Sequence, residues 1–309
     1  MRPAAALEVI GLGKRYGYAW GLRDCSFAIP PGRIAALVGP NGSGKSTLLR
    51  MVAGITRPTT GEVRIFGHPP SEHGEEMLSR IGYLDQERPL YRSFRVGEML
   101  RFGAKLNPSW DDASARRYLA ELKIPTESRV GNLSIGQQAQ VALTMCLAKR
   151  PELLLLDEPV AALDPLAREA VMTVLLQAVA DHGTTVLLSS HAIADLVTVC
   201  DYLIIISASR VSVADELDFV LASHRLLVGA RDQSPPDGAD VIAATHAGRQ
   251  TDLLVRLEEP ISDASWQVEE PTLEEIVIAY LRRSEASGAP SSDRPETAPR
   301  RRAHKQVLR

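Results

Sequence analysis

The 309-residue chain is 45% hydrophobic, which predicts a globular protein of about two domains with a sizeable core. Its formal net charge of −3 lacks the excess of Lys and Arg that a domain lying along nucleic acid needs, so bulk charge indicates no polyanionic partner. The three widely spaced cysteines, Cys25, Cys146 and Cys200, predict neither disulfides nor a zinc site, and no segment approaches the roughly 18 apolar residues that cross a bilayer, so we expect a cytosolic chain without a membrane span.

The first part of the chain, residues 7–30, alternates in a way that suits antiparallel strands, with Cys25, Phe27 and Ile29 on one face. Within it lies an aromatic segment, Lys14–Trp20. Its rings could stack on an adenine or cover the edge of a sheet, and the residues alone leave both possibilities open.

A short apolar run, residues 34–38, leads into the glycine-rich turn Gly39–Thr47, after which the chain can continue as a helix. The spacing from Gly39 to Lys45 and Ser46 is that of a P-loop. Backbone N–H groups in such a turn, next to a helix N-terminus, form a concave site for anions. We therefore expect Lys45 to reach the β and γ phosphates of a nucleotide and Ser46 to hold Mg2+.

The following segments predict a helical insertion between two sheet-forming halves. Residues 61–67 and 80–86 have the pattern of short strands, and the second ends in the polar pair Asp85 and Gln86. Residues 96–106 and 111–123 have helical spacing. We place the insertion at about residues 87–150 and assign no chemistry to its Trp110.

Further polar residues follow at the starts of helices and the ends of strands. Ser134 is placed like an N-cap, and Asp157 and Glu158 end the apolar run 153–156, which predicts a buried parallel strand with carboxylates at its ligand-binding edge. Downstream of a P-loop, these two acids are interpreted as the Mg2+-side carboxylate and a candidate base. His191 follows the next apolar strand, at the same edge, and is interpreted as a phosphate sensor.

Strands alternating with helices predict an α/β core with a mostly parallel sheet, which the strand at 203–207 is expected to close. Residues 216–283 look like a small α+β extension that ends in a helix from Pro271 to Arg283. Residues 284–309 have the composition of a disordered tail, whose basic end could be attracted to an anionic membrane surface.

The order of these motifs resembles the nucleotide-binding subunit of ATP-binding cassette (ABC) transporters, a P-loop NTPase fold, over about residues 5–215. The matching segments are Gly39–Thr47 (Walker A), Gln86 (Q-loop), Leu133–Gln137 (signature), Leu153–Glu158 (Walker B), Asp164 (D-loop) and His191 (switch histidine). A P-loop alone would also fit kinases, GTPases and helicases, but a signature between the Q-loop and Walker B removes most of these.

The resemblance implies that two such domains sandwich two ATP molecules, each site combining the Walker motifs of one subunit with the signature of the other. On that basis Tyr16 stacks on adenine, Glu158 is the general base, and His191 contacts the γ phosphate. The other expected site residues are Gly39, Asn41, Gly42, Ser43, Gly44, Lys45, Ser46 and Thr47 around the phosphates, Ser46, Gln86 and Asp157 around Mg2+, Ser134, Gly136 and Gln137 on the partner's γ phosphate, and Asp164 between the two sites.

One signature position departs from the family pattern LSGGQ, because Ile135 replaces the first glycine. A β-branched residue would be strained there if the position required a positive φ. The family tolerates side chains at this position, so we expect the signature to function.

The resemblance implies a motor subunit on the cytoplasmic face of the membrane, which hydrolyses ATP, pairs with a second ATPase subunit and drives a separately encoded permease through its helical insertion. The stretch 269–281 and the segment Asn107–Asp111 are similar to ATPase subunits of bacterial ABC-2 type exporters, which favours export. The alternative is a soluble ABC ATPase acting on ribosomes or DNA. Such relatives typically carry two cassettes or a long coiled coil, whereas this chain has one cassette and no sustained heptads. A third possibility is a nucleotide-binding regulator that does not hydrolyse ATP, and the presence of the candidate base Glu158 argues against it.

Overall fold

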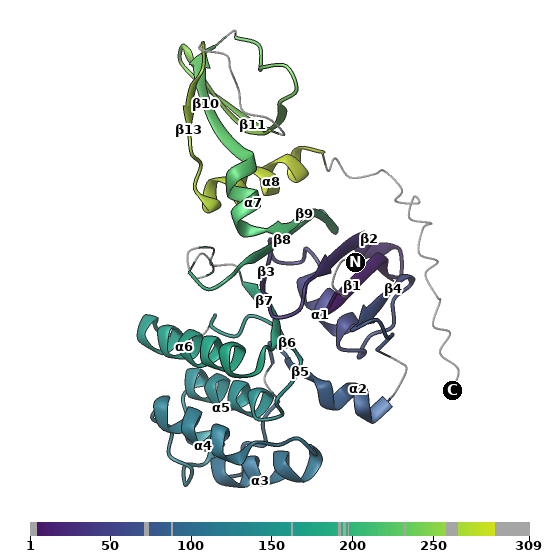
Figure 1. Cartoon of the computed structure of the whole chain (residues 1–309), viewed down its shortest axis with the longest axis vertical. Coiled ribbons are helices and arrows are strands. Elements are labelled where there is room, and N and C mark those ends of the chain that lie inside the picture. Colours follow the sequence, from purple (N-terminus) through teal and green to yellow (C-terminus); the bar gives the residue numbers. More distant parts are fainter. Residues whose placement is uncertain are drawn as a thin grey trace, which may run out of the picture.

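The protein is built around a six-stranded sheet (Figure 1). The computed structural model describes residues 5–70, 74–87, 89–161, 163–190, 193, 196, 198–231, 233–257 and 265–287. In spatial order the strands are β5 (Ile81–Leu84), β6 (Leu153–Leu156), β7 (Thr185–Ser190), β3 (Ile34–Val38), β8 (Tyr202–Ser207) and β9 (Arg210–Glu216). The first five strands run parallel, and every residue of β6, β7, β3 and β8 is buried, as expected for a sheet that is covered on both faces. The predicted α/β core is confirmed.

The edge of this sheet differs from the prediction. Strand β8 does not close the sheet, because β9 pairs with it on the outside in an antiparallel hairpin. The two residues of the turn, Ala208 and Ser209, have φ values of 45° and 63°. Tight hairpin turns of this kind usually carry Gly, Asn or Asp, so an Ala-Ser turn gives little sequence signal.

Each face of the central sheet has its own apolar layer, because alternate strand residues point to opposite sides. One layer contains Ala35 and Leu37 of β3 together with the helix after the P-loop and an antiparallel sheet. The elements on this side are α1 (Lys45–Val52), α2 (Gly74–Arg80), β1 (Leu7–Tyr16), β2 (Ala19–Ile29) and β4 (Thr60–Ile65). The sheet order β2-β1-β4 confirms the predicted antiparallel N-terminal subdomain.

The other face is covered by the helical insertion and the helix that follows β6. The elements on this side are α3 (Val96–Leu106), α4 (Asp112–Glu121), the 3-10 turn η1 (Val130–Asn132), α5 (Ile135–Leu147) and α6 (Pro165–His182). Asp111 fixes the start of α4, since its carboxylate accepts hydrogen bonds from the Ser114 N–H at 3.0 Å and from the Arg150 guanidinium. Hydrogen bonds from Ser114, together with Arg150, lower the pKa of Asp111 to about 2. The segment that resembles exporter subunits therefore contains a structural anchor.

A small α+β extension follows the six-stranded sheet and lies at the opposite end from the helical insertion (Figure 1). Its elements are α7 (Leu217–Ser223), β10 (His224–Ala230), β11 (Asp240–Ala247), β12 (Gln250–Arg256), β13 (Gln267–Glu269) and α8 (Leu273–Ser287). Ile276 and Val277 of α8 share the apolar layer of Leu203 in β8. The last helix extends four residues beyond the predicted end at Arg283, and the rest of the expected disordered tail lies outside the described residues. None of the described helices has the length and hydropathy needed to cross a membrane.

Candidate nucleotide site

The P-loop connects β3 to α1, and two of its glycines are required by close contacts. A Cβ atom on Gly39 would lie 2.3 Å from the Ile206 carbonyl oxygen, and one on Gly44 would lie 2.4 Å from the Gly21 carbonyl oxygen. Gly44 also has a φ of 109° and occupies the N-cap position of α1 without a side chain to accept the first N–H groups. These N–H groups are therefore available to an anion.

Lys45 is buried inside the loop. Its ammonium donates hydrogen bonds to the carbonyl oxygens of Gly39 at 2.7 Å and Pro40 at 3.2 Å. Burial lowers the pKa of Lys45, although the carboxylates of Glu158 and Asp157 act in the opposite direction. The loop thus surrounds a positive charge at the predicted phosphate site.

Two carboxylates follow β6, and a serine from the neighbouring strand β7 holds both residues in place. The Ser189 hydroxyl donates to Asp157 Oδ1 at 2.8 Å and accepts from the Glu158 N–H at 2.9 Å. Ser189 is fully buried, and Glu158 adopts a φ of 49°. The sequence interpretation missed Ser189, because only the parallel register of β6 and β7 brings it to Asp157.

The loop, one acid and the Q-loop glutamine line a single cavity of about 490 Å³. Its lining residues are Gly21, Gly39, Pro40, Asn41, Gly42, Gly44, Lys45, Ser46, Thr47, Gln86 and Glu158. We call it the P-loop cavity. The predicted phosphate-binding residues, Gln86 and Glu158 are thus brought together, except that Ser43 is buried beneath the loop and does not line the cavity.

Gly21 is a second residue that sequence interpretation missed. It separates the loop from Tyr16, since a Cβ atom on Gly21 would lie 3.1 Å from the Tyr16 ring. Tyr16 is 53% exposed and has the Lys14 ammonium 5.5 Å from its ring centre. The ring therefore lies beside the cavity, although it is not among the lining residues.

The donor atoms around the acids fit a hard divalent cation such as Mg2+. Ser46, Gln86 and Asp157 offer hydroxyl, amide and carboxylate oxygens, the ligand types that Mg2+ prefers. Among the described residues, the second carboxylate oxygen of Asp157, Oδ2, is buried and has no hydrogen-bond partner. An unpaired buried carboxylate oxygen is costly, and a nearby cation or its bound water would compensate for it.

Four further predicted residues, Ser134, Gly136, Gln137 and Asp164, line a second cavity of about 870 Å³, which we call the signature cavity. Ser134 caps α5, since its hydroxyl accepts from the Gln137 N–H at 3.1 Å while the Gln137 side chain accepts from the Ser134 N–H at 3.1 Å. Gly136 lies between them, and Asp164 caps α6 through the Ala167 N–H at 2.9 Å. In the part of the chain that the structure describes, no residue lines both the signature cavity and the P-loop cavity.

Comparison with known proteins identifies the family. The model of the family described as "ABC transporter" matches residues 22–161. The chain is 32% identical over 229 residues to "Nod factor export ATP-binding protein I" of Rhizobium meliloti, a match that covers 72% of this chain and 68% of that protein. The chain belongs to the ABC transporter family.

Other relatives have different transport names. "Fe(3+) ions import ATP-binding protein FbpC 2" of Rhodococcus jostii (strain RHA1) is 35% identical over 67% of this chain and 61% of its own length. The Nod factor export protein of Rhizobium meliloti (strain 1021) is matched over 64% of its length, so the chain covers less than two thirds of these two relatives. The solved "Structure of ATP binding subunit of ABC transporter" superposes with a TM-score of 0.64 and 29% identity, covering 70% of this chain and 92% of that chain.

The structure of the signature shows whether Ile135 strains the backbone of this ABC protein. Ile135 is the first residue of α5, its φ is not positive, and 67% of its surface is exposed. The concern about backbone strain was therefore wrong, because a helix N-terminus accepts a β-branched residue at ordinary dihedral angles. His191, the expected switch histidine, lies outside the described residues.

Proposed function

We propose that this ABC protein is an ATP-hydrolysing motor subunit that dimerises on ATP and drives a separately encoded membrane permease, on the cytoplasmic face of the membrane. The observation that carries the proposal is the division of the motifs between two separate cavities of one chain. One copy offers the P-loop, Gln86 and Glu158, and the signature that completes the site comes from a second copy.

In this site the loop N–H groups and Lys45 bind the phosphates of ATP. Ser46, Gln86 and Asp157 would hold Mg2+, which would supply positive charge to stabilise the phosphates during transfer. Glu158 polarises the attacking water, and Ser189 fixes the backbone from which Glu158 projects. Catalysis is then mainly positioning and charge stabilisation, as for phosphoryl transfer in general.

The partner copy contributes the capped N-terminus of α5. Ser134, Gly136 and Gln137 face the γ phosphate, where helix N–H groups and the helix dipole favour an anion. Asp164, at the start of α6 in the same cavity, links the two sites. His191 is proposed to contact the γ phosphate, and Tyr16 to stack on adenine.

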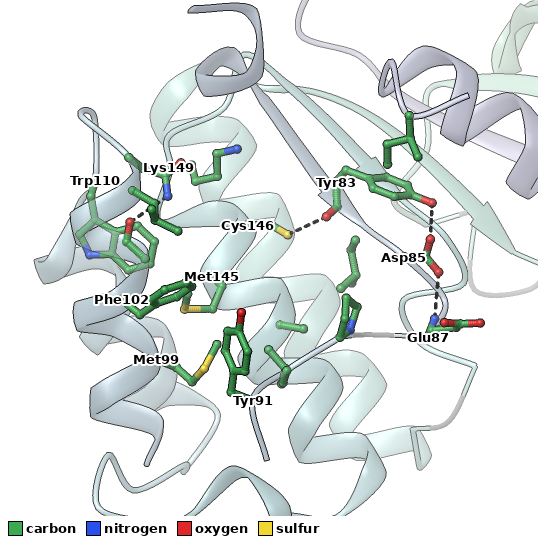
Figure 2. A pocket seen from close by; sticks show the side chains of 18 residues that line it. Tyr83, Asp85, Glu87, Tyr91, Met99, Phe102, Trp110, Met145, Cys146 and Lys149 are labelled. Atoms are coloured by element: carbon green, nitrogen blue, oxygen red, sulfur yellow. Dashed lines mark hydrogen bonds between the residues drawn. The ribbon is translucent and has the colours of Figure 1, made fainter. Parts of the chain in front are cut away.

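An apolar groove next to the Q-loop supports the permease contact. The groove has a volume of about 460 Å³, and Figure 2 shows Tyr91, Met99, Phe102, Trp110 and Met145 arranged around it. Two aliphatic side chains in its lining, Ile55 and Leu106, are more than 60% exposed. Exposed apolar surface in one groove is typical of a protein contact, and we assign it to a helix of the permease.

Export is the proposed direction. Its support is the similarity of residues 269–281 and Asn107–Asp111 to ABC-2 type exporter subunits. The names of the relatives include both an exporter and an importer. Uptake of a substrate into inverted vesicles that contain the co-purified permease would test the direction.

Substitution of Glu158 by Gln tests the motor function. Loss of a general base lowers turnover by about 100-fold or more. We expect Glu158→Gln to abolish phosphate release and to elute as an ATP-bound dimer in size-exclusion chromatography with light scattering. The matched control is Glu75→Gln, an exposed acid in the first turn of α2, which should leave turnover unchanged. A Glu158→Gln protein with wild-type turnover would contradict the assigned base, and one that stays monomeric at saturating ATP would contradict the ATP-dependent dimer.

A further inference from the structure

The residue that precedes the Q-loop glutamine, Asp85, has a densely hydrogen-bonded side chain. Its carboxylate accepts from the Arg50 guanidinium at 3.1 and 3.3 Å, from the Tyr83 hydroxyl at 2.9 Å and from the Glu87 N–H at 3.1 Å. Burial raises the pKa of Asp85, but these hydrogen bonds outweigh it and the net pKa is lowered. The hydrogen bonds therefore hold the side chain in one position.

The partners of Asp85 belong to elements that serve different parts of the protein. Arg50 is on α1, the same short helix that begins with Lys45 and Ser46 in the P-loop cavity. Four residues along a helix correspond to about 6 Å, so Arg50 and Ser46 are held on one rigid element. The carboxylate thus ties the start of the Q-loop to the helix that carries two phosphate and metal residues.

Asp85 also lies where the apolar groove adjoins the P-loop cavity. In the proposed function the groove binds the permease and the P-loop cavity binds ATP. Asp85 and Tyr83 line the apolar groove, and the next residue, Gln86, lines the P-loop cavity. Figure 2 shows Tyr83 and Asp85 at one side of the groove, joined by their hydrogen bond, with Glu87 beyond. Because the carboxylate also accepts from the Glu87 N–H, it holds the backbone on both sides of Gln86.

We propose that Asp85 is a positioning residue for Gln86, held by Arg50 and Tyr83, so that the Q-loop glutamine keeps a fixed position relative to Lys45 and Ser46. This inference rests on the proposed ATPase function. Asp85 contributes to the geometry of the site and little to stability, because its partner Arg50 is 41% exposed and an ion pair of that exposure adds little to stability. Misplacement of a catalytic group by about 1 Å costs up to about 100-fold in rate, so small shifts at Gln86 are sufficient.

A double-mutant cycle in the full chain tests this role. We expect Asp85→Asn to lower kcat about tenfold while leaving the affinity for a fluorescent ATP analogue within about twofold of wild type. Gln86→Ala should also lower kcat, and the double variant should be no slower than Gln86→Ala alone, because Asp85 acts through Gln86. Tyr83→Phe, which removes one of the hydrogen bonds and keeps the ring, should give an intermediate kcat.

The matched control is Glu152→Gln. Glu152 pairs with Arg80 at 2.6 and 2.9 Å near the other end of β5, so the variant weakens a similar ion pair away from Gln86. Its kcat should equal that of wild type. Multiplicative losses in the cycle, or an equal loss in Glu152→Gln, would overturn the inference and leave the ATPase assignment intact. A Gln86→Ala variant with wild-type turnover would overturn the role of Gln86 in the proposed function as well.

Discussion

Mixing two inactive variants would show whether each ATP site is shared between two copies of the chain. Lys45→Ala removes the buried ammonium from the P-loop cavity and leaves the signature cavity unchanged. Ser134→Asp keeps a good N-cap residue for α5, because Asp caps as well as Ser, but it places a negative charge at the position proposed to face the γ phosphate of the partner's ATP. Neither substituted residue lines the other cavity.

The expected magnitude follows from counting intact sites. Random pairing of equal amounts makes about half of the dimers mixed, and each mixed dimer has one site with a wild-type P-loop from one copy and a wild-type signature from the other. One intact site in half of the dimers corresponds to about a quarter of the wild-type number of sites, so we expect about a quarter of the wild-type rate. The rate of phosphate release should be highest when the two variants are present in equal amounts and should fall at any other ratio.

The assay is phosphate release at saturating ATP and Mg2+, with total protein fixed and the mixing ratio varied. A mixture of Lys45→Ala with Glu158→Gln is the control, because both changes affect the P-loop cavity and no intact site can form in any pair. If the Lys45→Ala and Ser134→Asp mixture stays as inactive as this control at every ratio, the shared-site reasoning is wrong.

Two further predictions concern single residues. Ile135→Gly should leave kcat within about twofold of wild type and cost at most about 1 kcal/mol of stability, because Ile135 is exposed at a helix start without positive φ; a tenfold gain in phosphate release would show that the side chain impairs the signature. Asp111→Asn, which keeps a cap but loses the charge facing Arg150, should destabilise the protein by roughly 2 kcal/mol in urea at pH 7, since a folded-state pKa of about 2 lies below the ordinary value of 3.8. That stabilisation is present above about pH 4 and is lost as the pH falls toward 2, so wild type and variant should converge there; a constant difference across this range would contradict the charge effect.

The sequence predicted the parts of the fold and site that depend on local pattern. The P-loop spacing, the apolar strand before Asp157 and the N-cap position of Ser134 each involve a few neighbouring residues, and the structure has them as expected. The contact between Ser189 and Asp157 joins residues 32 positions apart. No local pattern indicates such a pair, because it depends on which strands become neighbours and in which register.

Two other features were hidden for different physical reasons. The hairpin at Ala208 and Ser209 was missed because its residues adopt positive φ without the glycine or asparagine that usually marks such a turn. The role of Gly21 was missed because the need for glycine there comes from the Tyr16 ring, while its carbonyl oxygen in turn leaves no room for a side chain at Gly44. Both depend on backbone conformation or on contacts across elements.

The helix α8 has a consequence for how the protein can be divided. Its Ile276 and Val277 complete the apolar layer over β8, although they follow the ATPase segment by some 60 residues in the chain. Residues of the extension therefore form part of the apolar core of the ATPase segment, and we expect the two to unfold as one cooperative unit. A fragment that stops at residue 215 would expose apolar side chains of the sheet that carries the Walker motifs, so we expect it to be less stable than the full chain.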